Sequence, residues 1–134
     1  MDASTFDLAL AKKEIAIQNN VFMNALKNGD SVGIANCYAA NSKFMMPNSK
    51  SITGRENLIP VFSSLIKSGM TNIDIKIVEA WGNEEMLTVE QEWVFTDKSG
   101  NDIDRGKSLE LWTKENGKWK LFRDCFNSDL PIPN

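Results

Sequence analysis

The stretch Tyr38–Phe62, YAANSKFMMPNSKSITGRENLIPVF, decides the fold, because its local pattern changes repeatedly over a short distance. It reads as the end of a helix, a short apolar strand at 43–46, a polar loop and the start of a new helix. Thr53 and Glu56 have the T-x-x-E spacing of a capping box. Since an amphipathic helix precedes this stretch and strands follow it, we predict that it forms the mouth of a pocket.

Helical spacing dominates the chain before and within this stretch. The first helix is predicted to begin near Ser4, with Asp7 completing a cap, and to end at Gly29. Its expected apolar stripe is Phe6, Leu10, Ile17 and Val21, widened by Phe22, Ala25 and Leu26. A short second helix is expected to carry Val32, Ile34, Ala35 and Tyr38. The third helix is expected to run to Gly69 with a kink at Pro60.

After Gly69 the apolar period changes from that of a helix to that of a strand. Ile73, Ile75 and Ile77 alternate with polar residues, and residues 85–96, 105–114 and 118–126 are predicted to form further strands. Helices followed by antiparallel strands on short turns predict an α+β fold, with the helices packed on one face of a curved sheet. We expect one domain over residues 1–134, with about 128–134 as a loose tail.

Composition excludes several classes of function. The net charge of -3 and the pI near 5.0 argue against a nucleic-acid partner, which needs clustered Lys and Arg. No apolar run reaches the roughly 20 residues that span a bilayer, and the N-terminus lacks an apolar signal region, so we expect a cytoplasmic protein. With no His and two distant cysteines, Cys37 and Cys125, we expect reduced thiols, no metal and no cofactor.

The order of the elements, together with a set of short motifs, resembles the SnoaL-like and ketosteroid-isomerase-like superfamily, the cone fold of nuclear transport factor 2. The motifs are ALKNGD at 25–30, YAAN at 38–41, GRE at 54–56, RGKSLELW at 105–112, GKWKLFRD at 117–124 and NSD at 127–129. The resemblance covers about residues 6–130. It implies a pocket between the helices and the concave sheet, and a homodimer formed through the sheet.

The resemblance also allows the ketosteroid isomerase site to be compared position by position. The place of the general base aspartate is taken by Met46, which cannot accept a proton. Phe22 and Phe62 match two tyrosines of the oxyanion network, and the position of its protonated aspartate falls near Leu109. Because Tyr38 is what survives of that site, we expect no classical ketosteroid isomerase activity.

The last strand offers a replacement for the missing acid. The family comparison points Phe122, Asp124 and Phe126 into the pocket, although alternation alone cannot say which face is inside. Between two phenylalanines, Asp124 would have a raised pKa suited to a general acid or base, or it would simply bond Tyr38 or Gln91 and organise the interior. The complete expected pocket lining is Phe22, Tyr38, Met46, Phe62, Gln91, Trp93, Leu109, Leu111, Phe122, Asp124 and Phe126.

Three functions follow as hypotheses. The leading one is a homodimer that binds a small apolar or aromatic ligand in the cone. The first alternative is a SnoaL-like isomerase, dehydratase or cyclase that uses Asp124 with Tyr38 or Gln91. The second is an association module with a vestigial pocket, in which a sheet face bearing Glu110, Trp112 and Trp119 contacts the partner.

Overall fold

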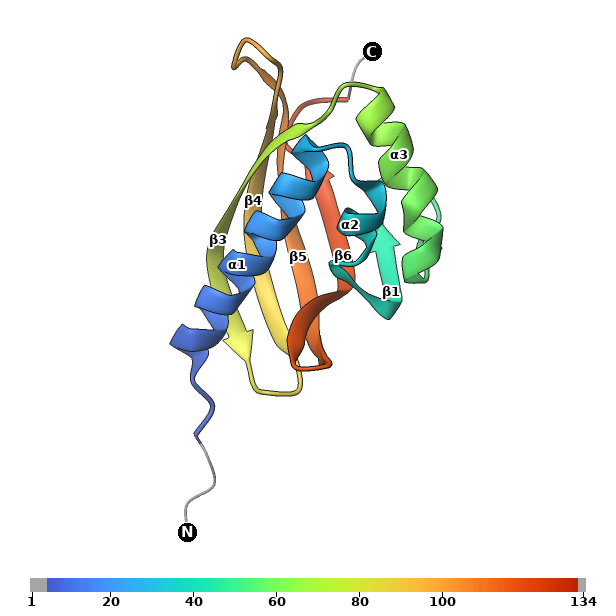
Figure 1. Cartoon of the computed structure of the whole chain (residues 1–134). Coiled ribbons are helices and arrows are strands. Elements are labelled where there is room, and N and C mark those ends of the chain that lie inside the picture. Colours follow the sequence, from blue (N-terminus) through green and yellow to red (C-terminus); the bar gives the residue numbers. More distant parts are fainter. Residues whose placement is uncertain (1–4, 133–134) are drawn as a thin grey trace.

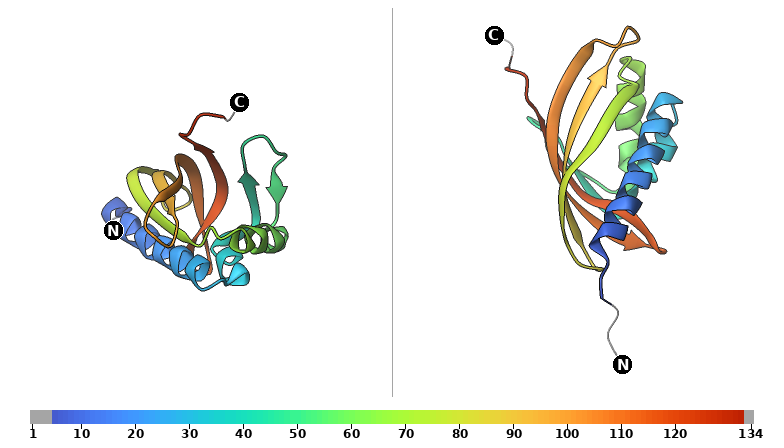
Figure 2. Two further views of the ribbon diagram at one scale, coloured as in Figure 1. Left: turned by 90° about the horizontal axis from the view of Figure 1, so that it is seen from above. Right: turned by 90° about the vertical axis from the view of Figure 1, so that its left-hand side faces the viewer.

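A computed structural model describes residues 5–132 (Figure 1). The helices are α1 (Leu8–Lys27), α2 (Ser31–Ala35), the 3-10 helix η1 (Arg55–Leu58) and α3 (Ile59–Lys67). The strands are β1 (Tyr38–Met45), β2 (Ile52–Thr53), β3 (Asn72–Gly82), β4 (Leu87–Thr96), β5 (Asp102–Glu115) and β6 (Lys118–Ser128). Figure 2 shows the helices on one side of a strongly curved sheet, which confirms the predicted α+β cone.

One sheet contains all these strands, in the order β2-β1-β6-β5-β4-β3. The pairs from β3 to β6 are antiparallel neighbours in the chain, as the short turns predicted. Asn116 and Gly117 have positive φ at the β5–β6 turn, the conformation that an Asn-Gly hairpin favours. In contrast, β1 runs parallel to β6, so the sheet is mixed and β1 extends it beyond the long hairpins.

The buried face of α1 differs from the predicted stripe. Leu10, Ile17 and Val21 are 52%, 58% and 46% exposed. Ala25 and Leu26 of that stripe are buried as predicted, and the face turned toward the sheet also contains Ala11, Ile15 and Asn19, which the prediction left out. This face has the same helical spacing but includes a polar Asn19, whose amide is satisfied inside the protein. The helix cap is Asp7, which accepts a hydrogen bond from the Leu10 amide at 3.0 Å, whereas Ser4 lies outside the described residues.

Three local predictions around the quoted stretch were wrong. Tyr38 begins β1 rather than ending a helix, because the chain pairs with β6 directly after Cys37. At the third helix no side-chain cap forms; the turn η1 follows Gly54, whose φ is 93°. Since α3 begins at Ile59, Pro60 falls in its first turn, where its missing N–H is not needed, and no kink results.

A bulge in β6 changes which of its residues face the helices. Leu111 on β5 lies opposite Arg123 and Trp112 lies opposite Leu121, which leaves Phe122 as an extra residue. Strict alternation therefore fails along this strand. Trp119 and Leu121 are buried before the bulge and Asp124 is buried after it, so residues of opposite parity share the inner face of β6.

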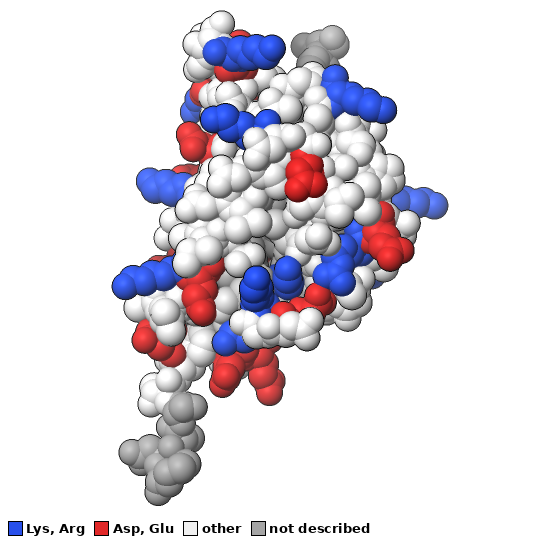
Figure 3. Space-filling model, viewed as in Figure 1, with Lys and Arg blue, Asp and Glu red and all other residues white. Residues whose placement is uncertain are grey.

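The outer surface of the helical layer has mixed charge. On the face drawn in Figure 3, Lys and Arg alternate with Asp and Glu around a mainly uncharged centre. This face lacks the clustered positive charge that binds a phosphate backbone. In the described part of the chain, no helix has both the length and the apolarity needed to cross a bilayer.

Candidate functional site

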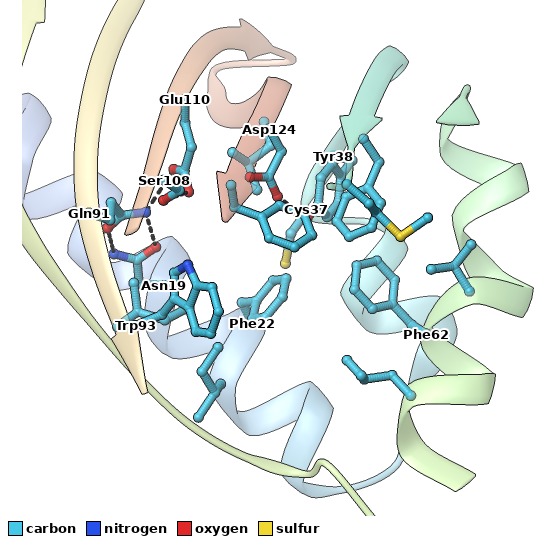
Figure 4. Close-up of a pocket in the computed structure, with 18 of the residues that line it drawn as sticks. Asn19, Phe22, Cys37, Tyr38, Phe62, Gln91, Trp93, Ser108, Glu110 and Asp124 are labelled. Carbon is cyan, nitrogen blue, oxygen red and sulfur yellow. Dashed lines mark hydrogen bonds between the residues drawn. The ribbon is translucent and has the colours of Figure 1, made fainter. Parts of the chain in front are cut away.

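A cavity of about 510 Å³ lies between the helices and the concave face of the sheet (Figure 4). Most of its wall is aromatic or aliphatic. Among the residues expected there, the structure places Phe22, Tyr38, Met46, Phe62, Gln91, Trp93, Asp124 and Phe126 on the wall. Val61, Leu65, Met70, Ile73, Ile75 and Phe95 complete much of the apolar surface.

The expected positions of Leu109, Leu111 and Phe122 need correction, because none of them is among the lining residues. Leu109 is 56% exposed on the outer face of β5, and Leu111 has the same parity. Phe122 is the bulged residue, and the Arg123 guanidinium lies 3.9 Å from the centre of its ring. The family comparison had placed Leu109 and Phe122 in the interior, but β5 turns its other face inward and the bulge displaces Phe122 on β6.

Glu110 and Trp112 likewise do not face a partner subunit. They are 6% and 1% exposed and line the cavity together with Ser108. The protonated aspartate of the isomerase was expected near Leu109, whereas the inward carboxyl group of β5 belongs to the next residue. The signal was the alternation of Ser108, Glu110 and Trp112, whose polar atoms satisfy one another once they are buried together.

A hydrogen-bonded network surrounds the Glu110 carboxylate. Its Oε1 accepts from Gln91 Nε2 at 2.7 Å and from Trp112 Nε1 at 2.8 Å, and its Oε2 accepts from Ser108 Oγ at 2.8 Å. Gln91 also accepts from Asn19 Nδ2 at 2.6 Å, which links β4 to α1. Sequence reasoning missed Asn19, Ser108 and Glu110. They are satisfied by one another, which is how a protein interior accommodates polar groups.

A second polar contact joins β1 to β6. The Tyr38 hydroxyl donates to Asp124 Oδ2 at 2.6 Å, and the two side chains are 0% and 7% exposed. Figure 4 shows the Asp124 carboxylate beside the Tyr38 ring at the inner wall of the cavity. The interior bond that the sequence suggested for Asp124 is therefore made with Tyr38 and not with Gln91.

Glu110 and Asp124 lie directly opposite each other on β5 and β6. Burial raises the pKa of Glu110 from 4.5 to about 8, and the negative charge of Asp124 adds to that rise. Burial also raises the pKa of Asp124 from 3.8 to about 6, while the bond from Tyr38 acts in the opposite direction. Like charges held this close resist ionising together, so near neutral pH the pair carries roughly one negative charge.

Cys37 supplies a thiol to the cavity wall. Burial raises the pKa of its thiol to about 11, and its Sγ donates to the Gly33 carbonyl at 3.6 Å. A thiol held in its protonated form is a poor nucleophile. Among the residues that the structure describes, no group of three or more His, Cys, Asp or Glu side chains is placed to hold a metal ion.

Residues 20–122 match the family model of the SnoaL-like domain. The chain belongs to the SnoaL-like family. This agrees with the resemblance seen in the sequence motifs, and it covers the quoted stretch and the residues that bond Glu110 directly. No curated protein sequence matches the chain.

Solved structures of similar shape extend the comparison. A cystatin-like protein of unknown function from Nostoc punctiforme is 20% identical, with a TM-score of 0.78 and coverage of 99% of this chain and 98% of that one. A ketosteroid isomerase-like protein from Erwinia carotovora atroseptica is 20% identical, with a TM-score of 0.71 and coverage of 87% and 95%. An NTF-2 like protein of unknown function from Shewanella oneidensis is 15% identical, with a TM-score of 0.74 and coverage of 87% and 98%. At these identities the likeness shows the fold alone.

Proposed function

We propose that this SnoaL-like protein binds a small, largely apolar or aromatic molecule in the cavity of its cone. The observation that carries the proposal is an open volume of about 510 Å³ with a mainly apolar wall. Phe22, Phe62, Trp93 and Phe126 supply flat surfaces from α1, α3, β4 and β6. A concave apolar cavity of this size with a few converging polar groups is the usual form of a small-molecule site.

The experiment is a titration with N-phenyl-1-naphthylamine, whose fluorescence rises in apolar surroundings. We expect saturable binding by the wild-type protein. Leu65→Trp, which adds a large ring to the cavity wall, should weaken binding by about tenfold or more, whereas Leu10→Trp on the exposed face of α1 should not. No saturable signal, or equal binding by the two variants, would reject the proposal.

A second candidate function is proton transfer on a carbonyl compound. The observation that favours it is the Tyr38–Asp124 bond of 2.6 Å, since both side chains line the cavity. Asp124 would take a proton from the carbon beside the carbonyl group, and Tyr38 would position the carboxylate. Gln91 is less suited to this role, because its amide oxygen and nitrogen already bond Asn19 and Glu110.

This second function is tested by exchange of the α-protons of 2-tetralone in deuterated buffer, followed by NMR. Wild type should accelerate the exchange, with Asp124 passing the proton to solvent and receiving a deuteron in return. Asp124→Asn should lose that acceleration, and Asp74→Asn, which removes an exposed carboxylate on β3, should keep it. Equal rates for wild type and Asp124→Asn would eliminate this function.

We also propose that the protein is a homodimer formed through the outer face of the sheet. Trp81 and Leu109 are 49% and 56% exposed on β3 and β5, and Leu111 lies in register with Trp81 across β4. The association hypothesis needs this revised surface, because Glu110, Trp112 and Trp119 are buried inside. Light scattering should give twice the chain mass for wild type and Leu10→Asp, and one chain mass for Leu109→Asp. A wild-type monomer at micromolar concentration would reject the dimer.

A further inference from the structure

The cavity combines aromatic rings with carboxyl groups of one sign. Asp104, Glu110 and Asp124 are on its wall, whereas Lys and Arg are missing from the described residues that line it. The whole chain contains no His. A ligand that enters therefore meets negative charge without a cationic side chain to offset it.

The two inner carboxyl groups differ in how far the protein satisfies them. Both oxygens of Glu110 accept hydrogen bonds from protein donors. Asp124 accepts one bond, at Oδ2 from Tyr38, and in the described part of the chain no donor reaches its Oδ1. In the described part of the chain, Ser42 Oγ is a side-chain oxygen that is fully buried and has no hydrogen-bond partner. Asp124 Oδ1 is not such an atom, so it lacks a partner without being fully buried. Oδ1 thus remains accessible from the cavity, on a residue that is only 7% exposed.

Aromatic rings line the same cavity as this oxygen. The ring of Phe126, two residues from Asp124 on the same face of β6, lies 5.0 Å from that of Phe44 and 6.2 Å from that of Trp93. The Tyr38 ring, whose hydroxyl bonds Asp124, lies 6.5 Å from the Phe22 ring. The faces of such rings attract cations, and the attraction grows when water is excluded.

We propose that the ligand of the cavity is an aromatic organic amine, whose ammonium group donates to Asp124 Oδ1 while its apolar part packs against the surrounding rings. This inference rests on the proposed binding function and names the chemical class of its ligand. The ammonium supplies the hydrogen bond that Oδ1 lacks and the positive charge that the wall lacks. A carboxylate ligand of the same size would instead bring like charge against the single negative charge of the Glu110–Asp124 pair, so we expect it to bind more weakly.

The experiment compares three ligands that share one ring system: 1-naphthylmethylamine, 1-naphthylmethanol and 1-naphthoate. Each is titrated calorimetrically into the full-length protein at pH 7.5. We expect the amine to bind about tenfold or more tightly than the alcohol, the usual gain of a charge-assisted hydrogen bond, and the carboxylate to bind more weakly than both. Asp124→Asn should remove the preference for the amine, while Asp74→Asn should keep it, since Asp74 is exposed on β3. Circular dichroism of both variants checks that they are folded.

The outcomes separate this inference from the function on which it rests. Binding of the alcohol supports an apolar cavity, and the ratio of amine to alcohol tests the ligand class. If the alcohol binds and the amine is not preferred, the amine proposal is overturned and the binding function stands. If none of the three ligands binds, both are overturned. If Asp124→Asn folds and keeps the preference, the assignment to Asp124 is overturned.

Discussion

Replacing Glu110 by glutamine should make the protein more stable at alkaline pH. The glutamine carbonyl can keep the bonds from Gln91 and Trp112, and its amide can donate to the Ser108 hydroxyl. The substitution therefore preserves shape and hydrogen bonding while it removes the ionisable group. What it takes away is the cost of charging a carboxyl group that is 6% exposed and faces Asp124.

The direction follows from proton linkage. The pKa of Glu110 is raised from 4.5 to about 8, so the folded protein holds a proton that the unfolded chain has already released. Stability is thus highest below the unfolded value and falls as the pH rises through about 8. A shift of this size corresponds to a loss of roughly 4–5 kcal/mol across that window. We expect Glu110→Gln to exceed wild type by about that amount at pH 8.5 and by about 1 kcal/mol at pH 5.

The assay is urea unfolding followed by tryptophan fluorescence at pH 5 and pH 8.5. Equal m values for wild type and variant would show that the change lies in stability and not in compactness. Glu92→Gln, an exposed position on the outer face of β4, is the matched control and should follow wild type at both pH values. A wild-type stability that does not fall between pH 5 and 8.5, or a Glu110→Gln curve parallel to it, would refute the reasoning.

Three further changes probe the interior. Tyr38→Phe should lower the unfolding free energy by about 2 kcal/mol at pH 8.5, because the buried Asp124 carboxylate loses its donor; a similar loss in an Asp124→Asn background would contradict this. Gly106→Ala should lower the free energy of unfolding in urea by about 1–3 kcal/mol, since a Cβ there would overlap the β4 indole and the β6 backbone. Unchanged stability would show that the neighbouring strands shift to make room for the methyl group. In the native protein an aromatic disulfide reagent should modify the exposed Cys125 quickly, whereas Cys37 should react only after unfolding. Fast reaction of both thiols would contradict the burial of Cys37.

Much of the fold can be predicted from the spacing of apolar residues. The predictions fail where two faces of one element are both candidates for burial. The alternation of Ile73, Ile75 and Ile77 placed β3 correctly, because one sheet face is covered and the other is not. On α1, hydrophobicity alone added the exposed Leu10 and Ile17 to the predicted stripe, although it placed Ala25 and Leu26 correctly. The interior accepts the polar Asn19 because Gln91 on β4 satisfies it, which is a tertiary fact that local spacing does not contain.

The site was harder to predict than the fold, because a one-residue change of parity exchanges the two faces of a strand. The chain contains Leu109 and Glu110 side by side, and the position count from the family comparison placed the leucine inside. Glu110 is inside instead, since Ser108 and Trp112 come with it and satisfy its oxygens. The bulge at Phe122 could not be predicted from residue types, because it comes from the register between β5 and β6. Tyr38 and Asp124 were identified because the family resemblance supplied their positions.

The buried carboxyl pair connects the stability of this protein to its proposed ligand. Two acids that face each other in an apolar cavity oppose folding, and removing one charge should relieve that opposition. An ammonium ligand would offset the same charge by binding beside Asp124. Addition of 1-naphthylmethylamine should therefore raise the melting temperature of wild type more than that of Asp124→Asn at pH 8.5, because binding to the native state stabilises it in proportion to affinity. Equal shifts for the two proteins would mean that the pair organises the interior and does not recognise a cation.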